Sequence, residues 1–262
     1  MAFSAFDLEN WRGDGFLLIQ PFLIGESLTQ LQSWVDEIER WVPGAGPWLQ
    51  HDEMTDCGPR RTRSENFTPF HEDIRRFLTE GVIIQMASEL LGEPAVLYKE
   101  KINYKHPGGG GYAPHQDMAA YPHITRCVTC LVAVDDAGAE NGCLEFTPGY
   151  HREILARGAD GCVADEVTGE LPWYKVPTAA GSLLWFHGLA PHRSGPNRAA
   201  RSRRALYLTY NALSEGDLRG RYYEDKERSF AVENQTAAGG SPRVSLIEHF
   251  KGQAVPQNGG QR

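Results

Sequence analysis

The chain has 262 residues, of which 41% are hydrophobic and 23% charged, the composition of an ordinary globular protein that fits in one domain. Its formal net charge of -8 argues against binding to nucleic acid or to an anionic membrane surface, because both select a basic face. No stretch is apolar over the length needed to cross a bilayer, and the N-terminus lacks the features of a secretory signal, so we expect a cytoplasmic protein.

The five cysteines predict free thiols. Their number is odd, and we see no secretory signal that would point to a disulfide framework. Cys127 and Cys130 form a CVTC run, but no second CxxC completes a zinc site, and the surrounding strand-forming sequence places residues three apart on opposite faces. We therefore expect buried thiols without redox or zinc chemistry.

The first third of the chain predicts one strand followed by helices. GFLLIQPF, residues 15–22, is a short apolar strand, and a helix with apolar residues at three-to-four spacing begins at Ser27 and ends at Pro43. Residues 44–69 are polar and rich in glycine, proline and charge, which predicts an irregular segment and leaves open whether it forms a lid. A second helical pattern runs from about 72 to 91, so we assign a helical part to residues 27–92.

From residue 95 to about 212 the pattern changes to short strands. Runs such as AVLYKEKINYK, ITRCVTCLVAV and RRALYLTYN have strand composition and are separated by turn residues. No helical crossover pattern separates them, which favours antiparallel sheets and a jelly-roll core over a parallel α/β sheet. We expect a mainly β protein with flanking α-helices, a single domain over residues 1–252, and a disordered tail over residues 253–262.

Two motifs predict a metal site. In YAPHQDMAAY, His115 and Asp117 are two apart in a strand-like context, so their side chains point to the same face. The stretch GSLLWFHGLAPHRSGPN supplies a further imidazole, from either His187 or His192. Two histidines and one carboxylate with open positions form the facial triad of non-haem Fe(II) oxygenases, and the pattern indicates a 2-oxoglutarate-dependent enzyme of that type.

Three stretches of the chain carry a family resemblance: HQD, VAVDDAGAENGCLEFTPGYHR and GSLLWFHGLAPHRSGPN, the last followed by an arginine that opens a strand. Together they resemble the phytanoyl-CoA dioxygenase family of Fe(II)- and 2-oxoglutarate-dependent oxygenases. The likeness extends over most of the chain, and includes bacterial members similar to 2-aminoethylphosphonate hydroxylases. It implies a double-stranded β-helix, the cupin-like jelly roll. It also implies hydroxylation of an unactivated C–H bond, with consumption of O2 and release of succinate and CO2.

The resemblance implies that His115, Asp117 and His192 hold Fe(II). His192 matches the family's H-x-S-x-x-N pattern, whereas His187 continues the preceding strand and is then a core or neighbouring imidazole. Neutral imidazoles and a hard carboxylate suit Fe(II) and leave sites for 2-oxoglutarate and O2. Related halogenases carry a small residue at the position of Asp117, so the carboxylate points to hydroxylation.

The family places the arginine that binds 2-oxoglutarate eleven positions after the distal histidine, at Arg203. A guanidinium suits this task because it matches a carboxylate with two parallel hydrogen bonds. Strand alternation puts Arg203 on the interior face, although Arg204 would take its place if the register slipped by one residue. Asn103 and Thr129, on strands near the site, are further candidates for binding 2-oxoglutarate.

Cationic and aromatic residues near the metal motif suit a small anionic or zwitterionic substrate, such as a carboxylate, a phosphonate or an acyl carrier. The alternative is that the lysines are solvated strand edges and the aromatic residues are core. The candidate substrate-binding residues are Lys101, Lys105, Tyr112, Tyr121, Arg126 and Arg193.

Two other functional classes share this scaffold. A cupin-like metal-dependent isomerase or epimerase would use the same ligands without 2-oxoglutarate and would not need Arg203. A non-catalytic binding module would be expected to lack one ligand, whereas this sequence carries all three. The sequence leaves the oligomeric state, the substrate and the site of hydroxylation open.

Overall fold

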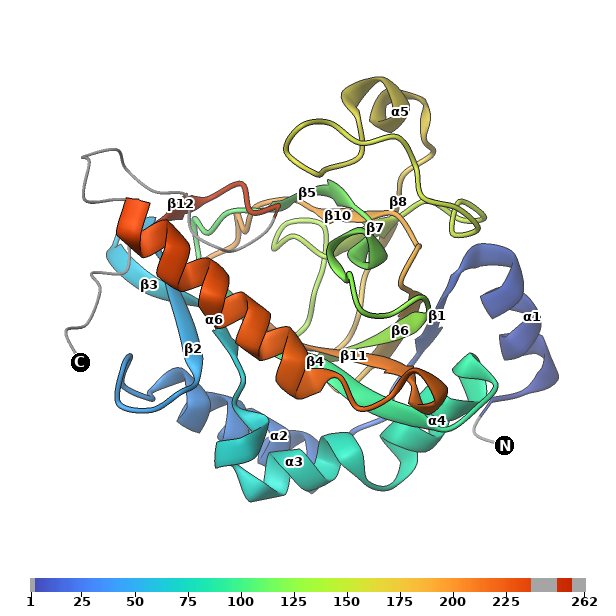
Figure 1. The fold of residues 1–262 in the computed structure, drawn as a ribbon, viewed down its shortest axis with the longest axis horizontal. Coiled ribbons are helices and arrows are strands. Elements are labelled where there is room, and N and C mark those ends of the chain that lie inside the picture. Colours follow the sequence, from blue (N-terminus) through green and yellow to red (C-terminus); the bar gives the residue numbers. More distant parts are fainter. Residues whose placement is uncertain (1–2, 237–248, 256–262) are drawn as a thin grey trace.

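The computed structural model describes residues 3–236 and 249–255, and within them two antiparallel sheets face each other (Figure 1). The large sheet has eight strands in the order β1-β9-β6-β11-β4-β3-β2-β12, and the small sheet has four in the order β5-β10-β7-β8. The strands of the large sheet are β1 (Phe16–Ile19), β2 (Leu49–Thr55), β3 (Gly58–Glu65), β4 (Ala95–Lys105), β6 (Cys127–Ala133), β9 (Leu183–His187), β11 (Arg203–Ala212) and β12 (Gln253–Ala254). Those of the small sheet are β5 (Tyr112–His115), β7 (Leu144–Phe146), β8 (Tyr174–Val176) and β10 (His192–Ser194).

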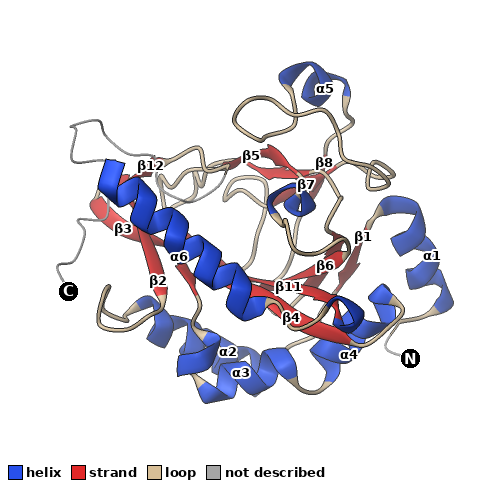
Figure 2. Ribbon diagram, in the orientation of Figure 1, coloured by secondary structure: helices blue, strands red, loops and turns tan. Residues whose placement is uncertain are grey.

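Helices cover the outer face of the large sheet, as Figure 2 shows. They are α2 (Glu26–Glu39), α3 (Glu72–Thr79) and α4 (Val82–Leu91), and α1 (Ala5–Asp14) packs beside β1. Alternation along β11 separates two cores, because Leu206 and Leu208 pack against these helices while Ala205 and Tyr207 face the small sheet. The predicted inward and outward faces of this strand are therefore confirmed, and Arg203 opens the inward set.

Helix α6 (Arg219–Thr236), which was not predicted from the sequence, lies alongside β4 (Figure 1). It is held there by polar contacts. The fully buried carboxylate of Glu100 accepts hydrogen bonds from the guanidinium of Arg219 at 2.6 and 3.0 Å and from the hydroxyl of Tyr223 at 3.3 Å. The short helix α5 (Asp165–Glu170) lies in the polar insertion that follows β7.

Three further expectations need correction. Residues 44–69 are not an irregular segment, because β2 and β3 form an antiparallel hairpin that extends the large sheet through β4. The helical pattern over 72–91 is two helices, α3 and α4, with Gly81 between them at a φ of 74°. The expected disordered tail starts with a strand, since β12 pairs with β2, and residues 256–262 lie outside the described part. In the described ranges no helix is both long and apolar enough to span a membrane.

Candidate metal centre and its surroundings

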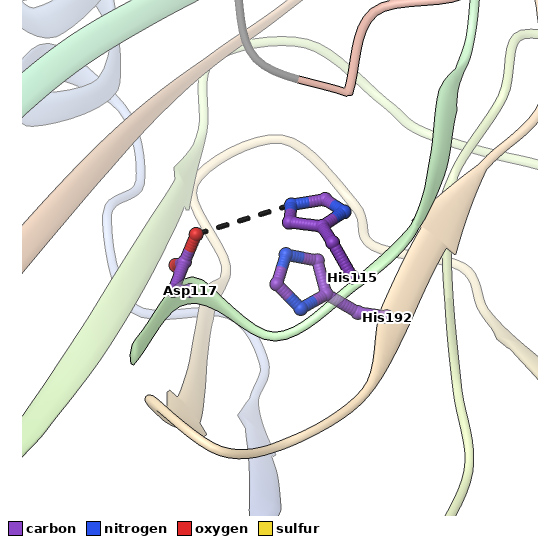
Figure 3. A group of neighbouring side chains, drawn as sticks. All are labelled: His115, Asp117 and His192. Carbon is purple, nitrogen blue, oxygen red and sulfur yellow. Dashed lines mark ion pairs between the residues drawn. The ribbon is translucent and has the colours of Figure 1, made fainter. Parts of the chain in front are cut away.

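His115, Asp117 and His192 meet between the two sheets, as predicted (Figure 3). His115 ends β5 and His192 opens β10, and the antiparallel register of these strands places the two residues opposite each other. Asp117 lies in the 3-10 turn Asp117–Ala120 just after β5, so a turn, not a continuing strand, brings it to the histidines. One ligand atom from each residue lies within 4.8 Å of the others, and His115 Nε2 is 3.9 Å from Asp117 Oδ1.

The backbone orients both imidazoles toward this point. The Nδ1 atom of His115 is 2.7 Å from the carbonyl oxygen of Ala113, and the Nδ1 atom of His192 is 3.0 Å from that of Ala190. These contacts assign the ring proton to Nδ1 and leave the Nε2 lone pair for a metal. Burial lowers the pKa of both imidazoles, to well below the ordinary value for His115, so both are neutral, as a metal ligand must be.

Asp117 is the anionic member of the group. Burial alone would raise the pKa of its carboxyl, but His192, Lys101 and Lys99 hold the pKa below its ordinary value. Thr129 on β6 lies with its hydroxyl 3.3 Å from Asp117 Oδ2 and orients the carboxylate. Two neutral imidazoles and a fixed carboxylate, all buried, fit a ferrous ion with open positions on the remaining face.

His187 is not a ligand. It ends β9, and its Nδ1 accepts a hydrogen bond from the amide of Leu189 at 3.0 Å. Its ring lies near Trp11, with a centroid separation of 6.2 Å. Burial, followed by the effect of His151, lowers the pKa of His187 to about 4. His187 is therefore an imidazole of the core, as expected when His192 is the metal ligand.

Of the two candidate arginines, only Arg203 points between the sheets. It is 2% exposed, one Nη donates to the carbonyl oxygen of Gly142, and its buried Nε has no hydrogen-bond partner among the described residues. Together with Leu131 and Ala205, its side chain lines a narrow gap between the sheets. Arg204 faces the helices instead, where its guanidinium pairs with Asp135 at 2.8 Å and with Asp36.

The inner face of β4 is a row of polar residues that begins beside Arg203. Lys105 pairs with Arg203 in register, and its Nζ donates to Ser194 Oγ at 2.9 Å, which places it at the arginine end and not near the metal. Asn103 follows, and its Oδ1 accepts from Arg63 Nε at 3.2 Å. Lys101 Nζ lies 5.0 Å from the centre of the Tyr207 ring.

These buried lysines have unusual electrostatics. Burial, followed by the neighbouring cations Lys99 and Arg63, lowers the pKa of Lys101 well below its ordinary value. Burial, followed by Arg203, does the same for the pKa of Lys105. Both shifts have the same meaning: in the described residues, the charged forms of these lysines lack enough negative charge to compensate them.

The two candidate tyrosines lie at this inner surface. Tyr112 on β5 has Arg63 Cζ 5.5 Å and Lys105 Nζ 5.9 Å from its ring centre. Tyr121 is 3% exposed, and its ring centre is 4.5 Å from the Nζ of Lys99.

Arg126 and Arg193 do not belong to the site, which corrects their prediction as substrate-binding residues. Arg126 has a side chain that is 51% exposed and pairs with Glu93. On β10, alternation turns Arg193 away from the face that carries His192, and its guanidinium pairs with Glu145 at 2.8 Å and lies 4.4 Å from the Trp173 ring centre. Closeness in sequence to a ligand did not bring either guanidinium to the metal.

The candidate site residues predicted from the sequence did not include Lys99 or Arg63. Both are buried and face the interior, Lys99 on β4 and Arg63 on β3. The signal for Lys99 was available, because it has the same strand parity as Lys101, Asn103 and Lys105. Arg63 could not be found in this way, since its strand was taken for a loop.

Two histidines and a carboxylate at one buried point, inside two facing antiparallel sheets, define a non-haem Fe(II) oxygenase site. The chain belongs to the phytanoyl-CoA dioxygenase family: the family described as Phytanoyl-CoA dioxygenase (PhyH) matches residues 11–205. It is an Fe(II)- and 2-oxoglutarate-dependent dioxygenase, as predicted, and the triad is the metal site that this activity requires.

The chain is similar over nearly its whole length to two phosphonate enzymes. It is 47% identical over 251 residues to a methylphosphonate hydroxylase from Gimesia maris, covering 95% of this chain and 96% of that protein. It is 40% identical over 235 residues to a 2-aminoethylphosphonate dioxygenase from Uncultured bacterium HF130_AEPn_1, covering 87% of this chain and 89% of that protein.

Solved structures confirm the predicted double-stranded β-helix. EctD from S. alaskensis, crystallised with 2-oxoglutarate and 5-hydroxyectoine, superposes with a TM-score of 0.73 at 19% identity, covering 82% of this chain and 78% of that one. The epimerase SnoN, in complex with Fe3+, alpha ketoglutarate and nogalamycin RO, gives a TM-score of 0.68 at 21% identity, covering 97% and 95%. At these identities the likeness establishes the fold.

Proposed function

We propose that this dioxygenase hydroxylates the carbon next to phosphorus in a small alkyl- or aminoalkylphosphonate. The names of the two similar proteins, a methylphosphonate hydroxylase and a 2-aminoethylphosphonate dioxygenase, support this substrate class. The observation that carries it is the buried positive charge beside the metal: Lys99 and Lys101 are 5% and 8% exposed, and neither ammonium has a carboxylate partner in the described part of the chain.

Buried cations of this kind are unfavourable until anions join them. Removing an ammonium group from water costs several kcal/mol, and only a partner charge with good geometry offsets that cost. The reaction brings two highly charged anions to this space, the 2-oxoglutarate dianion and the phosphonate. A neutral or cationic substrate would leave part of the positive charge uncompensated.

The residues divide between the two anions. We assign the far carboxylate of 2-oxoglutarate to Arg203, whose Nε is buried without a partner in the described residues. Lys105 lies beside Arg203. We assign Asn103 and Thr129 to the same cosubstrate, between Arg203 and the metal. Bound iron and 2-oxoglutarate supply the oxidising chemistry that uses O2, releases succinate and CO2, and places one oxygen atom on the substrate carbon.

The protein's own part is to bind, to orient and to exclude water. Lys101, Tyr121 and Tyr112 lie at the inner surface near Lys99 and Arg63, and we assign all three to the substrate side. None of them is required as a general base, because the reacting bond is a C–H bond next to the metal.

The same proposal extends to the whole protein. We propose that residues 1–252 act as one catalytic domain on a small molecule, without nucleic acid or membrane partners. A cytoplasmic location is supported by the cysteines, all five of which are free thiols in the structure.

The test is substrate-dependent turnover. The purified chain is loaded anaerobically with Fe(II) and 2-oxoglutarate, and O2 is admitted with methylphosphonate, 2-aminoethylphosphonate, or the matched methylsulfonate and acetate controls. We expect a phosphonate to raise succinate formation above the substrate-free rate, with a hydroxylated product of equal amount in the 31P NMR spectrum. Stimulation by the controls alone, or by none of the four compounds, contradicts the proposal.

A further inference from the structure

Lys99 lies at the end of the inner face that carries Asp117, away from Arg203. Both face the interior, but Arg203 pairs in register with Lys105 and Lys99 with Thr209, six residues further along β4. At about 3.3 Å per residue this separates their backbones by about 20 Å. The hydroxyl of Thr209 is 3.1 Å from that of Thr129, the residue that contacts the metal-binding carboxylate.

An anion bound between the triad and Arg203 would leave Lys99 without a partner. The 2-oxoglutarate molecule has a carboxylate at each end, so in this position it would lie along Tyr207 and Ala205, away from Lys99. The cation at Lys99 is therefore not needed for the cosubstrate. It is placed for the second anion of the reaction.

The surroundings of Lys99 hold its side chain without neutralising it. Its Nζ is 4.5 Å from the ring centre of Tyr121 and 5.5 Å from that of Tyr222 on α6, the helix that lies alongside β4 in Figure 1. Aromatic faces attract an ammonium group but carry no charge and accept no strong hydrogen bond. In the described residues its three N–H donors have no oxygen acceptor.

The nearby carboxylates are already engaged. Glu65 is 1% exposed and pairs with Arg63 at 3.2 Å and with Lys226. Asp117 is a metal ligand of the triad. Lys226 and Lys105 each have oxygen partners, whereas Lys99 and Lys101 have none in the described residues. Of these two, Lys99 lies near two tyrosine rings and Lys101 near one.

We propose that Lys99 is the residue that binds the phosphonate group, with Tyr121 and Tyr222 holding its ammonium in place. This proposal rests on the proposed function and names one residue that binds its substrate. The three N–H donors of Lys99 bond to phosphonate oxygens, which places the adjacent carbon beside the metal centre. Lys99 is a substrate-binding residue that neither the iron nor 2-oxoglutarate requires.

The test measures binding rather than turnover. Methylphosphonate and 2-aminoethylphosphonate are titrated into the anaerobic Fe(II) and 2-oxoglutarate complex, followed by calorimetry and by 31P line broadening. Lys99→Met removes the charge at nearly constant length, Lys99→Gln is a second neutral variant, and Lys99→Arg keeps a cation. Lys175→Met, at an exposed position of β8, is the matched control.

We expect both neutral variants to bind the phosphonate at least about 30-fold more weakly, Lys99→Arg to retain part of the affinity, and Lys175→Met to match the wild type. The 2-oxoglutarate affinity of all four variants should stay within about twofold. Phosphonate binding by both neutral variants within about threefold of the wild type overturns the proposal, as does an equal loss of 2-oxoglutarate binding. If the wild type itself binds neither phosphonate, the proposed function fails, and that result is seen before any variant is made.

Discussion

Replacing Arg203 with methionine should abolish productive 2-oxoglutarate binding while leaving the fold intact. In the structure Arg203 is buried, donates to the carbonyl oxygen of Gly142, and keeps its Nε without a partner in the described part of the chain. A hydrogen bond to a charged group contributes about 1.5–3 kcal/mol, and a guanidinium binds a carboxylate through two of them. The loss is therefore about 3 kcal/mol or more, which raises the Kd for 2-oxoglutarate about 150-fold.

Thermal unfolding with and without the cosubstrate measures this effect. At a concentration of 100 times its Kd, a ligand stabilises the folded state by about 2.7 kcal/mol. At the same concentration, a 150-fold weaker complex of Arg203→Met is stabilised by only about 0.3 kcal/mol. The rise in Tm that 2-oxoglutarate causes should therefore nearly disappear in this variant.

Arg204→Met is the matched control. Its guanidinium pairs with Asp135 and Asp36 on the helix side of the sheet, so its loss should lower the Tm of the free protein. The rise in Tm that 2-oxoglutarate causes should remain in Arg204→Met. The opposite pattern, in which Arg204→Met loses the ligand effect and Arg203→Met keeps it, would show that the register of β11 differs by one residue and would refute the assignment.

Three further changes test the surroundings of the site. Thr129→Val removes the hydroxyl next to Asp117, and we expect Fe(II) affinity, measured by chelator competition, to fall about 10-fold, with recovery in Thr129→Ser. Because burial lowers the pKa of His187 from 6.5 to about 4, the unfolded chain takes up a proton that the folded chain does not, and stability falls as the pH drops below 6.5. This loss is about 2 kcal/mol at pH 5, and it should be absent in urea unfolding of His187→Gln; an unchanged pH dependence contradicts the assignment. Arg219→Met leaves the buried carboxylate of Glu100 without its cation, which should lower the free energy of unfolding by about 3 kcal/mol, and a loss below about 1 kcal/mol would mean that α6 is held by other contacts.

The metal centre was predictable because its chemistry restricts both residue type and order. His115 and Asp117 are two residues apart along the chain, and His192 stands in a motif with a fixed pattern. Arg203 followed from a spacing combined with strand alternation, and the buried inward position confirms its side of the strand. The prediction that Arg193 binds substrate was wrong because of the same alternation: one step along a strand from His192 turns a side chain to the opposite face.

The hairpin of β2 and β3 could not be recognised from apolar periodicity. On β3 the buried side chains include Arg63, Ser64 and Glu65, so neither face shows the hydrophobic alternation by which a half-buried strand is identified. Helix α6 escaped for a related reason. Its contact with β4 depends on an ion pair to Glu100 and on Tyr223, and no apolar stripe marks it in the sequence.

These misread segments lie against β4, the strand that carries the inward-facing lysines. A site that binds two anions needs cations facing inward, and each buried cation removes an apolar residue from the pattern that reveals strands and helices. Arg63 therefore makes its segment look like surface in the sequence although it is buried in the structure. The fold tolerates this charge because the outer face of the same sheet is sealed by α2, α3 and α4, whose apolar contacts stabilise the strands from the other side.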